Sequence, residues 1–263
     1  MKFETLEIAR EGSVATIWMN RPDVHNAFNE ALIADLTAAC QALDADDSVR
    51  AVVLAGRGKS FSAGADLNWM RRAADASVDE NIADARKLAG MLRTLAEMNK
   101  PTIARVHGAA LGGGMGLASA CDICIAGEGA VFATSEVKFG IIPSAISPYV
   151  IRAIGARQAG RYFQTAERIS AGRAAELGLA HEAVPAAELD ARVQDIVAAL
   201  LQGGPKSQAA AKALIRAVAD RPVSDELVED TARRIATLRA TPEAKEGLAA
   251  FLDKRPAAWV PAT

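Results

Sequence analysis

Two glycine-rich segments could present main-chain hydrogen-bond donors to a substrate. The first is residues 61–67 (FSAGADL), and the second is residues 107–116 (HGAALGGGMG). Each segment joins an apolar strand to the start of a helix. Two such junctions can direct two backbone N–H groups at one oxygen atom, and their small side chains let a substrate approach the main chain. The pair therefore predicts a site that stabilises an oxyanion.

Two nucleotide-binding interpretations of these glycines fail on spacing. Gly58-Lys59-Ser60 has the ending of a phosphate-binding P-loop, but Val53 stands where that motif requires its first glycine. In the second segment, Leu117 stands where a dinucleotide-binding motif requires its last glycine. The glycines remain compatible with close helix packing or with main-chain donors at a catalytic site.

Glu136 is the most prominent ionisable side chain near these segments. Its neighbours along the chain are largely apolar, and burial among them would raise the pKa of the carboxyl group into a range suited to proton transfer. From the local pattern alone, a solvated glutamate on a loop is the simpler interpretation.

The elements that must position these residues alternate between strand and helix. Strands are predicted at residues 3–8, 14–19, 51–55, 102–106 and 123–125, and helices at 81–98 and 111–120. Asn29 is predicted to cap a further helix that buries Leu32, Leu36, Cys40 and Leu43. The alternation indicates an α/β fold with a largely parallel sheet. From Pro148 onward the chain is predicted to be mostly helical, with helices near 186–201, 205–218, 225–238 and 242–252.

Composition narrows the class of protein. The chain has 263 residues, 51% of them hydrophobic, and a formal net charge of -2. This balance favours a globular protein and argues against a nucleic-acid-binding surface. Cys40, Cys121 and Cys124 fit a reducing compartment, and the start of the chain has no apolar core of signal length. The prediction is a cytoplasmic protein with no membrane partner and no metal site, because the histidines lack metal-ligand spacing.

Taken together, residues 61–67, residues 107–116 and the segment around Glu136 resemble the crotonase family, the enoyl-CoA hydratase/isomerase superfamily. The resemblance runs from about Val14 to the C-terminal helix. It implies a spiral of ββα units with an acyl-CoA site over residues 1–200, then a helical oligomerisation region over 201–263. It also implies a homotrimer or a dimer of trimers, and no cofactor beyond the coenzyme A of the substrate itself.

The resemblance assigns roles to particular residues. The N–H groups of Ala63 and Gly113 would hold the thioester carbonyl oxygen, and Glu136 would transfer the proton. Contacts to the substrate and its coenzyme A would come from Val24, Ala27, Lys59, Gly64, Ala65, Asp66 and Leu67. Phe251 and Lys254 would reach the coenzyme A of a neighbouring subunit.

One position departs from the family pattern. Two-glutamate hydratases of this family carry their other catalytic glutamate where this chain has Gly116. The segment 135–151 resembles bacterial hydratases of leucine and acyclic-terpene catabolism, whose substrates carry a second carboxylate. That carboxylate could position the water or bind in the space left by the missing side chain.

The predicted function is therefore hydration of an enoyl-CoA. The substrate would be branched or carboxylated, such as 3-methylglutaconyl-CoA. Two alternatives stay open: an enoyl-CoA isomerase that uses a single glutamate, and a non-catalytic homologue that binds coenzyme A or RNA.

Overall fold

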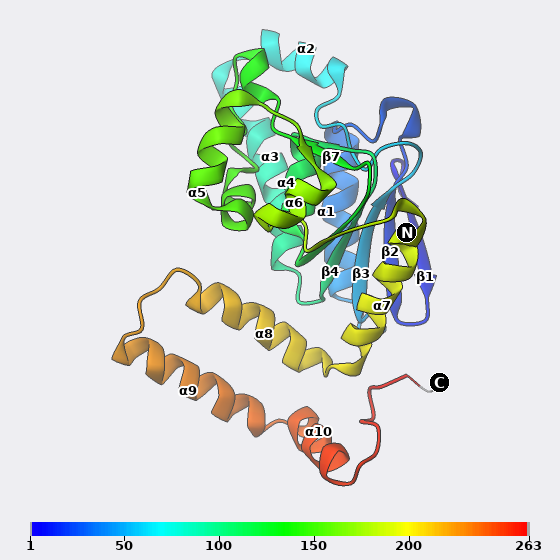
Figure 1. Ribbon diagram of the computed structural model, residues 1–263, viewed down its shortest axis with the longest axis vertical. Helices are drawn as coiled ribbons and strands as arrows, with labels where there is room; N and C mark the ends of the chain where they lie inside the picture. Colours follow the sequence, from blue (N-terminus) through cyan, green and yellow to red (C-terminus); the bar gives the residue numbers. More distant parts are fainter. Residues whose placement is uncertain (1, 262–263) are drawn as a thin grey trace.

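A six-stranded sheet forms the centre of the molecule in the computed structural model, which describes residues 2–261 (Figure 1). Its strand order is β1-β2-β3-β4-β6-β9. The strands are β1 (Leu6–Glu11), β2 (Val14–Met19), β3 (Ala51–Gly56), β4 (Thr102–Val106), β6 (Ile123–Gly127) and β9 (Glu182–Val184). Strand β1 runs antiparallel to β2, and every other neighbouring pair is parallel. The predicted α/β class with a largely parallel sheet is confirmed.

A second, smaller sheet of order β5-β7-β8 stands beside the first. Its strands are β5 (Ala109–Leu111), β7 (Val131–Ala133) and β8 (Ile169–Ser170). The helices of the main body are α1 (Glu30–Asp44), α2 (Leu67–Asp75), α3 (Val78–Glu97), α4 (Gly113–Ala120), α5 (Ser147–Thr165), α6 (Ala171–Leu177) and α7 (Leu189–Gln202). Short 3₁₀ turns are η1 (Pro22–Val24), η2 (Glu136–Phe139) and η3 (Ala186–Glu188).

The large sheet is buried on both faces, as expected for parallel strands that alternate with helices. Leu54 and Val106 point into the main core, which also holds buried side chains of α1, α3 and α4. Val53, one residue before Leu54, and Ile103, three residues before Val106, point to the other face and pack with Val193 of α7. The continuous apolar run of β3 follows directly from this double burial.

The structure differs from the predicted elements at several points. The first strand begins at Leu6 and continues to Glu11, not over residues 3–8. The helix predicted from residue 111 begins at Gly113, because residues 109–111 pair with β7 and Gly112 takes a φ of 50°. Helix α2, none of whose side chains is buried, was not predicted. By contrast, the Asn29 cap is confirmed, with its side chain accepting from the Leu32 N–H at 2.9 Å.

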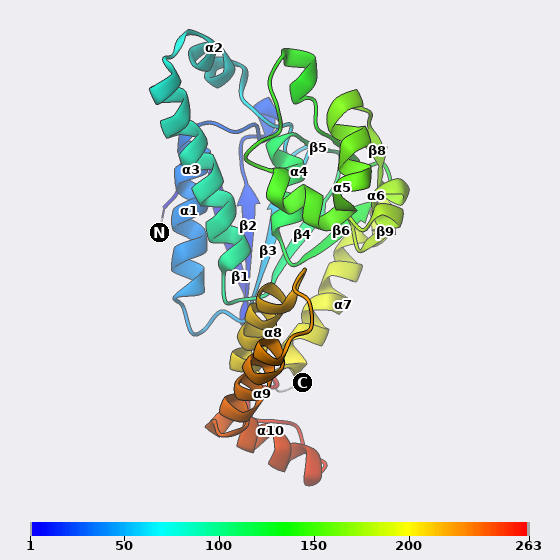
Figure 2. The same ribbon diagram turned by 90° about the vertical axis from the view of Figure 1, so that its left-hand side faces the viewer.

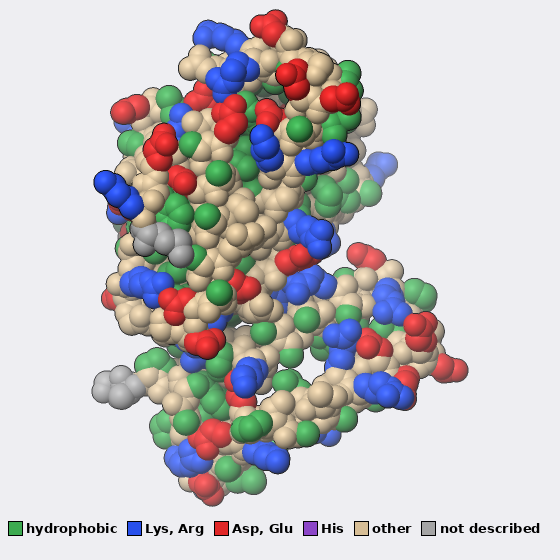
Figure 3. Space-filling view, turned by 180° about the vertical axis from the view of Figure 1, so that it is seen from behind, with side chains coloured by type: hydrophobic (Ala, Val, Ile, Leu, Met, Phe, Trp, Pro, Cys, Tyr) green, Lys and Arg blue, Asp and Glu red, His purple; other side chains and the backbone are tan. Residues whose placement is uncertain are grey.

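The C-terminal helices α8 (Pro205–Val218), α9 (Asp225–Arg239) and α10 (Pro242–Leu252) form an arm that extends away from the main body (Figure 2). The division predicted at residue 200 falls inside α7, so in the structure the arm starts after that helix. Lys212 anchors the arm, with its Nζ 2.7 Å from Asp122 Oδ2. Hydrophobic side chains are visible on the surface of the arm (Figure 3). The large exposed ones on its helices are Leu214, Ile215, Val228, Ile235, Leu248, Phe251 and Leu252.

A buried asparagine holds together the two loops that follow β2 and β3. The Asn26 Nδ2 donates to the carbonyl oxygens of Arg57 at 2.9 Å and Ser60 at 2.8 Å. Its Oδ1 accepts from the Arg21 N–H at 2.9 Å. All three hydrogen bonds come from one fully buried amide, so the loop after β2 has a fixed position against the chain that leads into residues 61–67.

Candidate active site

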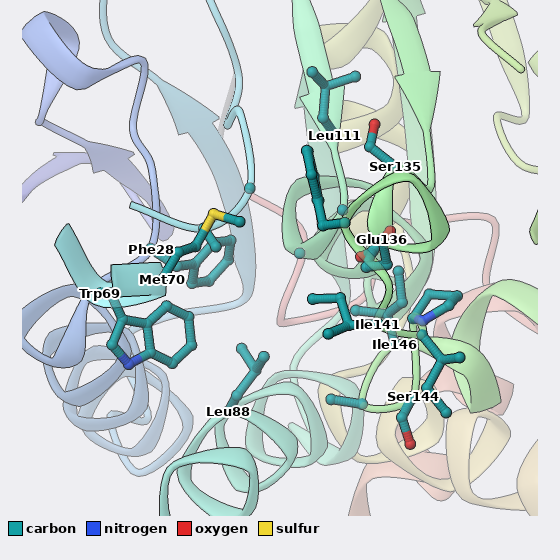
Figure 4. Close-up of a pocket in the computed structure, with 18 of the residues that line it drawn as sticks. Phe28, Trp69, Met70, Leu88, Leu111, Ser135, Glu136, Ile141, Ser144 and Ile146 are labelled. Atoms are coloured by element: carbon teal, nitrogen blue, oxygen red, sulfur yellow. The ribbon is translucent and has the colours of Figure 1, made fainter. Parts of the chain in front are cut away.

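A cavity of about 360 Å³ lies among α2, α3, the start of α4 and the segment after β7 (Figure 4). Most of its lining is apolar. Phe28, Trp69, Met70 and Leu88 form one side in Figure 4, and Leu111, Ile141 and Ile146 lie on the other with Glu136. Within the described residues 2–261, no lysine, arginine or histidine lines this cavity. An apolar chamber with one carboxylate is suited to an uncharged chain that reacts at a single point.

The two glycine-rich segments meet at the wall of this cavity. The Ser62 N–H donates to the Ala109 carbonyl, and the Leu111 N–H donates back to the Ser62 carbonyl, each at 2.9 Å. Gly64 has a φ of 90°, and a Cβ there would lie 3.0 Å from the Leu111 carbonyl oxygen. The main chains can approach this closely only because residue 64 has no side chain.

Several N–H groups at this junction lack a hydrogen-bond partner among residues 2–261, and two of them directly follow the closely packed Gly64 and Gly112. One belongs to Gly113, the first residue of α4, where a helix leaves its N–H groups unpaired. The other belongs to Ala65, which was predicted only as a substrate contact. Both residues line the cavity. The start of α4 also carries the positive end of the helix dipole, which favours negative charge nearby.

The N–H group of Ala63 is not free. It donates to the carbonyl oxygen of His25 at 2.9 Å, so it serves to hold the loop after β2. The sequence-based prediction that Ala63 supplies a donor to the substrate is contradicted by this contact. The error arises because both alanines stand in a small-residue segment, and only the distant His25 carbonyl decides which N–H is engaged.

Glu136 projects into the cavity from the 3₁₀ turn η2, directly after β7. Its Oε2 is buried and has no hydrogen-bond partner within residues 2–261. Burial raises the pKa of this carboxyl group above its ordinary value. A Cβ at Gly112 would lie 3.0 Å from the Glu136 Oε1, so the carboxylate sits against the main chain at the start of α4. A half-buried carboxylate with one buried, unpaired oxygen beside free N–H groups is a candidate proton-transfer group.

The other glycines of α4 are also required by close contacts. A Cβ at Gly113 would lie 2.8 Å from the Phe28 ring, and one at Gly114 would lie 2.3 Å from the Ser62 carbonyl oxygen. Distances below 3.0 Å are not found for real Cβ atoms, so a side chain at either position would force its neighbours to move. Helix α4 therefore offers its main chain to the cavity, and no side chain from these two positions.

Position 116 also has no space for a side chain. A Cβ there would lie 2.2 Å from the Ile146 Cγ2 and 2.8 Å from its Cβ. Ile146 is 2% exposed and lines the cavity, whereas Gly116 does not. The hypothesis that a substrate carboxylate binds in a space left at residue 116 is contradicted, because Ile146 fills that space.

Asp66 does not line the cavity, although it was predicted to contact the substrate, and it stabilises the fold locally. Its carboxylate caps α2 by accepting from the Asn68 N–H at 2.9 Å, and it accepts from the Arg21 Nη2 at 2.9 Å. Burial would raise the pKa of this carboxyl group, but its hydrogen bond to Arg21 and the backbone N–H groups outweigh that effect and hold the pKa below its ordinary value. The ionised pair fixes the loop that carries Ala65.

The remaining predicted contacts separate into two groups. Gly64, Ala65 and Leu67 line the cavity. Val24, Ala27 and Lys59 lie outside its lining, on the neighbouring loops that Asn26 joins; Val24 and Lys59 are exposed and Ala27 is buried. Phe251 is the penultimate residue of α10 and Lys254 follows that helix, at the opposite end of the molecule from α2 (Figure 1). The structure does not bring these last two residues to the cavity of their own chain.

The histidine rings make local hydrogen bonds. His25 Nδ1 lies 3.1 Å from Ser60 Oγ, and His107 Nε2 lies 2.9 Å from the Gly58 carbonyl oxygen. No cluster of three potential metal-ligating side chains occurs within residues 2–261. None of the helices in this part of the chain is long and apolar enough to cross a bilayer.

Comparisons with known proteins agree with this geometry. Residues 9–261 match the family profile described as enoyl-CoA hydratase/isomerase. The crystal structure of an enoyl-CoA hydratase from Shewanella pealeana is 41% identical, covers 98% of this chain and 97% of that chain, and superposes with a TM-score of 0.95. The crotonyl-CoA hydratase of Syntrophomonas wolfei is 34% identical over 266 residues, covering 99% of each chain.

A third relative is the 2,3-dehydroadipyl-CoA hydratase of Escherichia coli. It is 33% identical over 252 residues, which cover 95% of this chain and 96% of that protein. The predicted crotonase fold is confirmed by the superposition and the family match. On the full-length similarity, the chain belongs to the enoyl-CoA hydratase/isomerase family.

Proposed function

We propose that the protein adds water across the α,β double bond of an enoyl-CoA. The observation that carries this proposal is the pair of free N–H groups, on Ala65 and Gly113, beside the buried carboxylate of Glu136. The two N–H groups hold the thioester carbonyl oxygen of the substrate. They are fixed before the reaction begins, so they stabilise the negative charge that develops on this oxygen. The names of the relatives support hydration as the reaction.

A single carboxylate can carry out both proton transfers. Glu136 accepts a proton from water while the water oxygen forms a bond to Cβ of the substrate. The electrons of the double bond move through Cα and the thioester carbon to give an enolate, whose oxygen is held by the two N–H groups. Glu136 then returns the proton to Cα, and the carboxylate is regenerated. The raised pKa of Glu136 suits this cycle, because the group must both gain and lose a proton.

The cavity favours an uncharged acyl chain, so we propose a short or methyl-branched enoyl-CoA as the substrate. A carboxylate buried against Phe28, Leu88 and Ile141 would lose its hydration without gaining an opposite charge, which is strongly unfavourable. The carboxylate of the predicted carboxylated substrate thus has no oppositely charged partner in the described lining. The Escherichia coli relative is named for an acyl-CoA with a distal carboxylate, so carboxylated substrates remain the second candidate. In that case the carboxylate reaches solvent at the cavity mouth.

The arm supports a proposal on assembly. Phe251 is 80% exposed and lies far from the cavity of its own chain, together with Lys254. Exposed apolar side chains also occur along α8 and α9, and such surfaces usually mark contacts between proteins. We propose a homotrimer or a dimer of trimers in which Phe251 and Lys254 of one subunit contact the coenzyme A bound by the next.

The first prediction concerns the reaction and its substrate. Crotonyl-CoA and 3-methylcrotonyl-CoA should each gain the mass of one water on incubation with the protein, and 3-methylglutaconyl-CoA should react with a lower kcat/KM. Mass spectrometry of the products separates hydration from isomerisation, which leaves the mass unchanged. A product of unchanged mass would establish the isomerase alternative, and no turnover of any enoyl-CoA would indicate a binding protein. A preference for 3-methylglutaconyl-CoA would show that the apolar lining does not set specificity.

A second prediction concerns Glu136. Glu136→Gln should lower kcat about 10²–10⁴-fold, because a positioned acid or base contributes that much, while coenzyme A binding persists. In the wild type, kcat/KM should fall as the pH decreases through the pKa of Glu136, which burial places above its ordinary value. The carboxylate must be ionised to accept a proton from water, so activity is lost on the acid side. The exposed Glu128 gives a matched control, Glu128→Gln, which should leave the profile unchanged.

A third prediction distinguishes Ala65 from Ala63. Replacing the backbone amide by an ester, through incorporation of lactic acid, removes a single N–H and keeps the side chain. The ester at position 65 should lower kcat about 10²–10³-fold with little change in the melting temperature. The ester at position 63 should instead lower the melting temperature, since it removes the hydrogen bond to the His25 carbonyl. The reverse pattern would restore Ala63 as the donor.

The fourth prediction is a trimeric or hexameric mass by light scattering at micromolar concentration. Phe251→Ala should raise KM for acyl-CoA if a neighbouring subunit completes the site. Leu214→Ala, a change of an exposed apolar residue on α8, provides the comparison for a general loss of arm surface. A monomer with full activity would refute the proposed assembly.

A further inference from the structure

Glu136 is the single ionisable side chain that lines the cavity within residues 2–261. The start of α4 borders the same cavity, yet the positions along it are closed to side chains by Phe28 and the Ser62 carbonyl. The apolar lining beside α4 includes Ile146, which also contacts Gly116 of that helix.

Ile146 stands between Gly116 and the cavity. It is the residue before α5 and is almost fully buried, so the surrounding core fixes its position. Its Cγ2 lies 2.2 Å from the place of a Cβ at residue 116, and its own Cβ lies 2.8 Å from that place. Rotation about χ1 would move the Cγ2 but not the Cβ, because the backbone sets the Cβ position. The contact is therefore relieved by removing the Ile146 side chain and not by a change of rotamer.

We propose that Ile146 is the residue that restricts this site to one carboxylate. Its side chain excludes every side chain at position 116. Its methyl groups line the cavity where a second acid or base would otherwise lie. This inference rests on the proposed hydration reaction for its chemical meaning, whereas its steric part stands on the contacts alone. Positions 116 and 146 should then behave as a coupled pair, although they are 30 residues apart.

The steric part is tested by a double-mutant cycle of stability. Gly116→Ala alone should lower the melting temperature by about 3–10 °C, because the added methyl meets Ile146. In the Ile146→Gly background the same change should leave the melting temperature unchanged or raise it, since alanine favours a helix more than glycine. Gly90→Ala on α3, where a Cβ has nothing within 4 Å, should raise or maintain the melting temperature in both backgrounds. Equal effects of Gly116→Ala in the two backgrounds would overturn the proposal.

The proposal that Ile146 limits the site to one carboxylate is tested by two variants that differ only in a carboxylate against an amide. Gly116→Glu and Gly116→Gln are each combined with Ile146→Gly and assayed with crotonyl-CoA. The glutamate double variant should exceed the glutamine double variant in kcat/KM by about 10-fold or more, since one added acid or base acts in the cavity. Its pH profile should also gain a second titrating group, because two nearby carboxylates ionise in separate steps.

The outcomes separate the two proposals. Equal activity of the glutamate and glutamine double variants, with both folded, would mean that Ile146 does not control the chemistry of the site. If either double variant fails to fold, the alanine cycle still decides whether Ile146 closes position 116. Failure of the wild type to hydrate any enoyl-CoA would remove the proposed function, yet a coupled stability cycle would still establish the steric role of Ile146.

Discussion

The site depends on a close contact between two main chains. Gly64 has a φ of 90° and passes so close to Leu111 that a Cβ would lie 3.0 Å from its carbonyl oxygen, and hydrogen bonds between Ser62 and β5 hold the two segments together. This contact places the Ala65 and Gly113 N–H groups on one cavity. Any larger residue at position 64 would separate the segments and so separate the two donors. The glycines are thus a condition for the geometry, since a shift of about 1 Å in such donors is enough to lose catalysis.

The buried carboxylate sets a second constraint, because it works against the fold that holds it. Folding raises the pKa of Glu136, so the folded chain binds this proton more tightly than the unfolded chain does. Its contribution to stability is therefore greatest at low pH and declines as the pH rises from the ordinary glutamate value through the raised one. When the group is ionised, its Oε2 lies in an apolar cavity with no hydrogen-bond partner among residues 2–261. The protein tolerates this because the large core around β3, β4 and α1 supplies stability elsewhere.

Sequence reasoning succeeded where the determining contacts are local or periodic. The Asn29 cap and the helix after it follow from spacing, and β3 follows from an apolar run that ends in a glycine turn. It failed where a partner distant in sequence decides the outcome. Whether Ala63 or Ala65 has the free N–H depends on the His25 carbonyl, and whether position 116 is open depends on Ile146. No window of residues around either position contains that information, so the family pattern alone assigned a donor and a space that the fold does not provide.

The resulting architecture separates two tasks between two parts of the chain. Helix α4 and the loop around Ala65 provide main-chain donors, whose positions depend on the glycines that let the two segments pack closely. The segment from η2 to the start of α5 provides Glu136, Ile141 and Ile146, which determine the acid–base group and the shape of the cavity. Changes in this second segment can alter the substrate or the chemistry while the donors for the enolate oxygen stay in place. Enolate stabilisation is common to hydration and isomerisation, so the same main-chain donors can serve either reaction.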